Sequence, residues 1–207
     1  GKVKVIQSQK EPFISLDTDA VIYDDVKKYI DKKDSLVGFH YEMFGNEFYP
    51  SRDDIKVVET YDWDEKLNWE LLPINVAVTY FGDDVIKSHY TNECMRFMKE
   101  NSEYVKNDYS SKSRMLFAEQ RLLPMICNKL GREYKTILES IWNPSLNSWM
   151  HTRHSKFSKL WGSIFTHLWS EKVLLRNDET REINYCKNTI TMIRSLDFDG
   201  TIYNKIK

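Results

Sequence analysis

The feature that most constrains this chain is an apolar run that ends in two closely spaced carboxylates. Residues 12–16 are mostly apolar, Asp17 and Asp19 follow with one residue between them, and a second apolar run begins at Ala20. In an extended backbone, side chains two residues apart point to the same side. Carboxylates that converge in this way repel each other unless a cation lies between them, and a hard divalent ion such as Mg²⁺ or Mn²⁺ is the common solution. The segment also fits a strand that ends in a solvated turn, with the aspartates as turn and cap residues.

The composition limits the classes of partner. The 207 residues carry 30 Lys and Arg against 31 Asp and Glu, so there is no basic excess of the kind that a nucleic-acid interface requires. The length and the 41% hydrophobic content predict one large domain, or one domain with an appended subdomain, with a substantial core. Three widely spaced cysteines do not suggest a disulfide framework, and neither a signal peptide nor a membrane-spanning run is visible. We therefore expect a cytoplasmic protein.

Strand and helix signals alternate along the chain, which predicts an α/β domain. We expect strands at residues 2–6, 12–16, 37–40 and 73–82, helices at 26–30, from 84, at 113–130 and at 178–195, and polar loops at 44–54 and 143–155. Pro124 should kink or divide the helix that contains it, because proline lacks the N–H that bonds to the preceding turn.

Four short motifs follow one another along the chain. Asp17-Thr18-Asp19 comes first, a strand with Asn75-Val76-Ala77-Val78 follows, a helix then carries Glu119-Gln120, and a late His167 precedes Lys172. Together they resemble nucleotide-sugar glycosyltransferases of the GT-A fold, most closely glycosyltransferase family 8 and its uncharacterised bacterial relatives. The resemblance covers roughly residues 12–172 and implies a metal-dependent hexosyltransferase-like enzyme that moves a sugar from a nucleotide-sugar donor to a glycan or glycoconjugate acceptor.

The resemblance also implies a fold and a role for each motif residue. The fold would be one GT-A-like domain over residues 1–207, a mixed sheet flanked by helices, with a strand-rich metal and donor region at 1–100 and a mainly helical acceptor region at 101–207. Mn²⁺ or Mg²⁺ would be held by Asp17, Asp19 and His167, the donor diphosphate by Lys172, and the reacting sugar would lie near Asn75, Glu119 and Gln120. Glu119 stands where the family has Asp, and Trp169 and Ser170 stand where it has Gly.

The position of the first motif departs from the family pattern. In GT-A enzymes a nucleotide-binding half precedes the Asp-x-Asp motif, whereas here only sixteen residues precede Asp17, and the first residue is Gly1 rather than Met. We expect that this half has been removed from a longer protein, that the fold is a reduced one, or that another chain supplies the half, for example in a homo-oligomer.

Other interpretations of the same residues stay open. Asp17 could be the nucleophile of a Mg²⁺-dependent haloacid-dehalogenase-like phosphatase, and residues 196–201 resemble the first motif of that family, although little chain follows them. The chain could also be a non-catalytic carbohydrate-binding or interaction domain. Taken singly, His167 fits a core histidine, Asn75 a turn, Glu119 a solvated helix position and Lys172 a surface lysine. A zinc site at His151 and His154 lacks any supporting motif.

Overall fold

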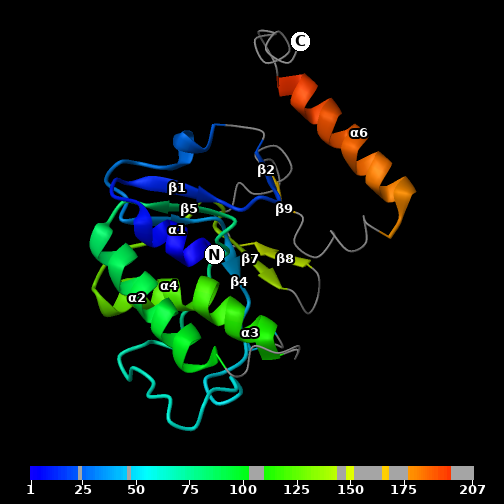
Figure 1. The fold of residues 1–207 in the computed structure, drawn as a ribbon. Helices are drawn as coiled ribbons and strands as arrows, with labels where there is room; N and C mark the ends of the chain where they lie inside the picture. The colour runs from blue at the N-terminus through cyan, green and yellow to red at the C-terminus, as the bar shows by residue number, and fades with distance from the viewer. Residues whose placement is uncertain are drawn as a thin grey trace. The chain divides into compact units, whose positions relative to one another are not determined.

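The computed structural model describes residues 1–22, 25–45, 48–102, 110–143, 148–151, 165–167 and 177–196. It is a mixed α/β structure with a mixed sheet flanked by helices (Figure 1), which confirms the predicted fold class at this level. The chain divides into two compact units, Gly1–Asp17 with Tyr29–Phe157, and Thr18–Lys28 with Ser158–Lys207. Within the described residues, no helix is both long and apolar enough to cross a membrane.

The first unit is built on a four-stranded mixed sheet. Its strand order is β1 (Phe13–Leu16), β5 (Val78–Phe81), β3 (Leu36–Gly38) and β6 (Lys135–Thr136). The β1–β5 and β5–β3 pairs are antiparallel, whereas β3 and β6 are parallel. A smaller sheet joins β4 (Tyr41–Glu42) in parallel to β7 (Ser140–Asn143), which pairs antiparallel with β8 (Ser148–His151).

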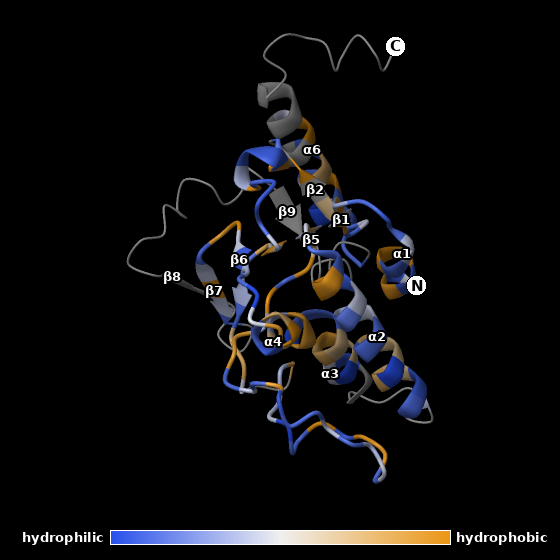
Figure 2. Cartoon of the chain, turned by 90° about the vertical axis from the view of Figure 1, so that its left-hand side faces the viewer, coloured by the Kyte–Doolittle hydropathy of each residue, from blue (hydrophilic) through white to orange (hydrophobic). Residues whose placement is uncertain are grey.

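The helices of the first unit lie on the same side of β1 and β5 (Figure 1). They are α1 (Lys2–Ser8), α2 (Asp84–Glu100), α3 (Ser110–Leu116), the π-helical turn η3 (Phe117–Arg121) and α4 (Leu122–Lys129). Figure 2 shows hydrophilic and hydrophobic residues alternating along α2, as expected of a helix with one face toward the core. That core joins sheet and helices through Leu36, Val76, Phe81, Ile86, Tyr90, Cys94, Phe97, Phe117, Leu122 and Ile126.

Two helix ends follow directly from local sequence. Asp83 caps α2, because its carboxylate accepts hydrogen bonds from the backbone N–H groups of Val85 and Ile86. Past the end of α4, Gly131 takes a positive φ of 63°, and Arg132 N–H donates to the carbonyl of Cys127 at 2.9 Å. This arrangement is a Schellman motif, in which glycine supplies the left-handed residue.

The π-helical turn η3 and Pro124 together explain how the chain passes from α3 into α4. Proline lacks an N–H group, so the carbonyl of Gln120, four residues earlier, cannot accept the usual α-helical hydrogen bond from residue 124. That carbonyl instead accepts a hydrogen bond from Ile74 N–H at 3.1 Å. The predicted interruption near Pro124 is therefore present as a wide turn that ties the helix to the segment before β5.

The second unit contains β2 (Ala20–Ile22), β9 (Phe165–His167) and α6 (Glu179–Leu196). Strands β2 and β9 pair antiparallel, with Ala20 opposite His167 and Ile22 opposite Phe165. The 3-10 helix η1 (Val26–Tyr29) spans the boundary between the units. The predicted helices at 26–30 and 178–195 are thus confirmed.

Three predictions about local structure are wrong. Residues 2–6 form helix α1 rather than a strand, because Val3 and Ile6, three residues apart, are buried against the core. Residues 143–155 are not wholly a loop, since Ser148–His151 forms strand β8. The strand expected at 73–82 is reduced to β5, because the Asn75 side chain accepts the hydrogen bond of Ala77 N–H at 3.0 Å and interrupts the ladder.

Candidate functional site

Asp17 lies directly after β1 and is held there by its backbone. Its N–H donates to the carbonyl of Ala77 at 2.8 Å. The carboxylate is about three-quarters buried and forms an ion pair with the ammonium of Lys2, with 2.5 Å between Nζ and Oδ1. The same ammonium donates to the carbonyl of Val76 at 3.1 Å. Asp17 is therefore a partly buried carboxylate that already holds a cationic group.

Glu119 lies in η3 and belongs to the same cluster of charges. Burial raises the pKa of Glu119 above its usual range, the ammonium of Lys2 opposes that rise, and the carboxylate of Asp17 adds to it. Two carboxylates that are far apart in sequence therefore interact electrostatically with each other and with one lysine. A π-helical turn of this kind is often found at functional sites.

The raised pKa of Glu119 predicts a pH dependence of stability. A carboxyl group whose pKa is higher in the folded state contributes stability that is present below its unfolded pKa and is lost as pH rises through the folded pKa. We expect Glu119→Gln to match wild type near pH 4 and to become progressively more stable than wild type toward pH 7. Urea unfolding of both proteins across this range measures the difference. A difference that stays constant with pH would contradict the prediction.

Asn75 sits in a buried polar network behind Asp17. Asn75 is only 5% exposed. Its Nδ2 group donates a hydrogen bond to Glu42 Oε1 at 3.0 Å, and its Oδ1 atom accepts one from Ala77 N–H. The Nε2 atom of His40 lies 3.1 Å from the same Glu42 oxygen. Both ends of the Asn75 amide are thus engaged inside the protein, and they fix the backbone at Ala77 to which Asp17 is bonded.

Gln120 is connected to the same region through Tyr49. The phenol of Tyr49 donates to Gln120 Oε1 at 2.5 Å. Burial, and next the charge of Glu42, raise the pKa of Tyr49 well above its usual value, so the phenol stays a donor. The backbones of Asp17 and Gln120 are thus hydrogen-bonded to Ala77 and Ile74, and Asn75 lies between these two residues in sequence. Glu119 joins them through its charge interaction with Asp17.

The other predicted metal ligands belong to the second unit. The chain leaves β1 at Leu16 and residues 18–19 form a turn, so the extended geometry assumed for Asp17 and Asp19 does not hold there. Ala20, which follows Asp19, pairs with His167 across β2 and β9. Two predicted ligands from distant parts of the sequence therefore occupy neighbouring backbone positions. Lys172, His154 and Asp197 lie outside the described residues.

The chemistry of these donors fits a hard divalent cation. Carboxylate and carbonyl oxygens suit Mg²⁺ and Mn²⁺, and imidazole nitrogen is also accepted by Mn²⁺. Asp17 and the Val76 carbonyl already bind the positively charged ammonium of Lys2, which occupies the position that a metal ion at these oxygens would take. Among the described residues, no group of three or more His, Cys, Asp or Glu side chains is arranged to hold a metal.

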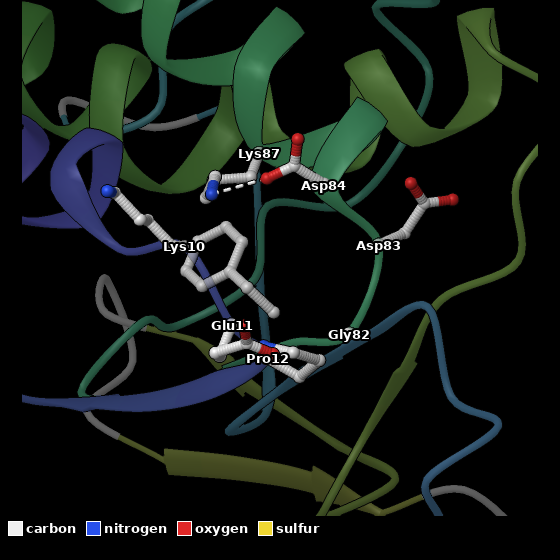
Figure 3. Close-up of a pocket in the computed structure, with 8 residues that line it drawn as sticks. Lys10, Glu11, Pro12, Gly82, Asp83, Asp84 and Lys87 are labelled. Atoms are coloured by element: carbon white, nitrogen blue, oxygen red, sulfur yellow. Dashed lines mark ion pairs between the residues drawn. The ribbon is translucent and has the colours of Figure 1, made fainter.

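A small pocket of about 90 Å³ lies elsewhere, at the start of α2. Figure 3 shows Lys87 reaching toward Asp84, while Asp83 points away from both lysines. Lys87 forms an ion pair with Asp84 and also donates to the carbonyl of Gln9. The lining contains none of the predicted site residues; it consists of Lys10, Glu11, Pro12, Phe81, Gly82, Asp83, Asp84 and Lys87.

Three residues of the charged and polar clusters were not predicted from sequence. His40 and Glu42 are two residues apart around β4, so the spacing rule applied to Asp17 and Asp19 would also have brought these two together. Lys2 carries no such signal, because its pairing with Asp17 depends on how α1 packs against the sheet unit.

Comparison with known proteins finds no match for this chain. No family model matches the chain. No curated protein and no solved structure matches it either.

Proposed function

We propose that this chain carries the metal-binding and acceptor part of a GT-A-like glycosyltransferase, which moves a sugar from a nucleotide donor to a carbohydrate acceptor. The observation that carries the proposal is the pairing of β2 with β9. It sets His167 opposite the residue that follows Asp19, as a shared metal site would require. The order of the four motifs along the sequence is the second support.

In this proposal each of the predicted site residues has one role in sugar transfer. A divalent ion held by Asp17, Asp19 and His167 would neutralise the negative charge that builds on the departing diphosphate. Lys172 adds a second positive charge for the same leaving group. Glu119 and Gln120 orient the donor sugar from the η3 turn. Asn75 acts as a positioning residue, because its buried amide fixes the backbone at Ala77, and the N–H of Asp17 is bonded to the Ala77 carbonyl.

Binding of nucleotide sugars tests the proposal directly. We expect one of UDP-, GDP- or CDP-linked sugars to raise the melting temperature of the wild type in Mn²⁺, because a ligand that binds only the folded state stabilises it, by about 2.7 kcal/mol at a hundredfold excess over Kd. Asp17→Asn should lose this stabilisation. The matched control is Asp53→Asn, which changes an exposed aspartate in the long connection between β4 and β5 and should behave as wild type.

Three measurements separate the alternatives. If no nucleotide sugar stabilises the wild type in Mn²⁺, and a longer chain that includes preceding residues is equally silent, the transferase proposal fails. Hydrolysis of an aryl phosphate that Asp17→Asn abolishes would point to the phosphatase. Carbohydrate binding that survives Asp17→Ala and Asp19→Ala would point to a non-catalytic domain.

A further inference from the structure

We infer that the ammonium of Lys2 competes with the divalent cation for Asp17, so that the metal-free chain carries an internal counter-ion at its own metal ligand. This inference rests on the proposed function, because it takes Asp17 as a ligand of that ion. Occupancy of the site is then controlled by Lys2, which does not belong to any of the four sequence motifs.

The contacts of Lys2 are those of a bound cation. Its Nζ lies 2.5 Å from Asp17 Oδ1 and 3.1 Å from the Val76 carbonyl oxygen. Both partners are hard oxygen donors of the kind that Mg²⁺ and Mn²⁺ prefer. Lys2 and Asp17 expose only 23% and 26% of their side chains, so the pair is screened by solvent less than a surface ion pair.

The charges around Asp17 favour a metal ion that replaces the ammonium of Lys2 over one that binds beside it. Asp17 and Glu119 contribute two negative charges, and Lys2 contributes one positive charge that acts on both. A divalent ion at Asp17 would stand within a few ångströms of the ammonium, where two positive charges repel strongly in a partly buried site. Metal binding must therefore displace Lys2 from the carboxylate, and the energy of the ion pair is subtracted from the affinity for the metal.

Helix α1 allows Lys2 to leave without unfolding. The helix is anchored by Val3 and Ile6, which are 6% and 3% exposed, and its far end is tied by the bond from Lys87 to the Gln9 carbonyl. Lys2 is the first residue of α1, with a flexible four-carbon side chain. Its ammonium can rotate into solvent while the rest of α1 stays packed.

Titration of Mn²⁺ into the metal-free chain, followed by calorimetry or by the paramagnetic resonance of free Mn²⁺, tests the competition. We expect Lys2→Met to bind Mn²⁺ about tenfold more tightly than wild type, within the usual range of coupling between two ligands. Lys4→Met is the matched control, since Lys4 is exposed on the same helix, and it should bind as wild type does. Lys2→Arg, which keeps the charge, should also bind weakly. The double variant Lys2→Met with Asp17→Asn should lose the gain.

Thermal melting gives a second readout. Without metal, Lys2→Met should melt below wild type, because Asp17 and Glu119 lose the charge between them, and Mn²⁺ should raise its melting temperature more than that of wild type. Equal Mn²⁺ affinity in Lys2→Met and Lys4→Met overturns the inference while leaving the metal site intact. Absence of Mn²⁺ binding in every variant also overturns it, and the nucleotide-sugar melts then judge the proposed function separately.

Discussion

Arg121→Ala should lower the free energy of unfolding by about 3 kcal/mol, since it removes charge-assisted hydrogen bonds and leaves two partly buried carbonyls without these donors. The Arg121 residue is 2% exposed. One arm of its guanidinium donates to the carbonyl of Pro50 and the other to that of Trp69 at 2.8 Å. The group also lies 4.9 Å from the centroid of the Trp69 ring and 5.5 Å from that of Phe44. It thereby ties two irregular segments to the η3 turn.

The opposing cost of burying this charge does not reverse the sign. Burial lowers the pKa of Arg121 to about 10, so the guanidinium is still charged near neutral pH. Denaturant unfolding at pH 7 measures the loss. Arg132→Ala is the control, because Arg132 is half exposed and pairs with Asp83 at the surface, where an ion pair contributes about 1 kcal/mol or less. Equal losses in the two variants would contradict the role given to Arg121.

Gly82→Ala should be about as damaging, with a loss of roughly 3 kcal/mol, because the added methyl group meets backbone rather than a movable side chain. A Cβ atom at residue 82 would overlap the carbonyl oxygen of Asp34 and lie 2.8 Å from the Tyr80 ring. The approach is close because the N–H groups of Gly82 and Asp83 both donate to the carbonyl of Ser35, at 3.0 and 3.1 Å.

Gly38→Ala is the matched control for this substitution. Its Cβ would lie 3.0 Å from Cδ1 and 3.3 Å from Cβ of Ile74, so the closest conflict is with the far end of a side chain, which can shift where a backbone carbonyl cannot. We expect a loss of about 1 kcal/mol in thermal or urea unfolding. A loss at Gly38 equal to that at Gly82 would mean that the backbone contact with Asp34 is not the cause.

The helices could be predicted largely from local chemistry. Asp83 caps α2, Gly131 ends α4 and Pro124 marks the interruption at η3, and each acts through its own backbone or that of its neighbours. Helix α1 was missed because Lys-Val-Lys-Val alternates like a strand, whereas Val3 and Ile6 also fit one face of a helix. Only packing against the core decides between the two periods.

The candidate site could be predicted only as a set of residue types in order. Two of its contacts join residues far apart in sequence, namely the ion pair of Lys2 with Asp17 and the hydrogen bond from Tyr49 to Gln120. No local sequence pattern predicts either contact. The Asn75 side chain likewise accepts the hydrogen bond of Ala77 N–H, whereas strand propensity alone predicts that this N–H bonds to a neighbouring strand. The pairing of His167 with Ala20 agrees with the motif order, yet the role of His167 in binding metal stays a prediction.

The η3 turn makes this part of the chain sensitive to length as well as to sequence. A π-helical turn holds one residue more than the α-helix around it needs, so deleting one residue from 117–121 would remove the wide turn and leave only the kink at Pro124. Each residue turns an α-helix by about 100°, and such a deletion would swing Glu119 away from Asp17 while α4 kept its own face. Single-residue deletions here should therefore separate folding from function more cleanly than substitutions can.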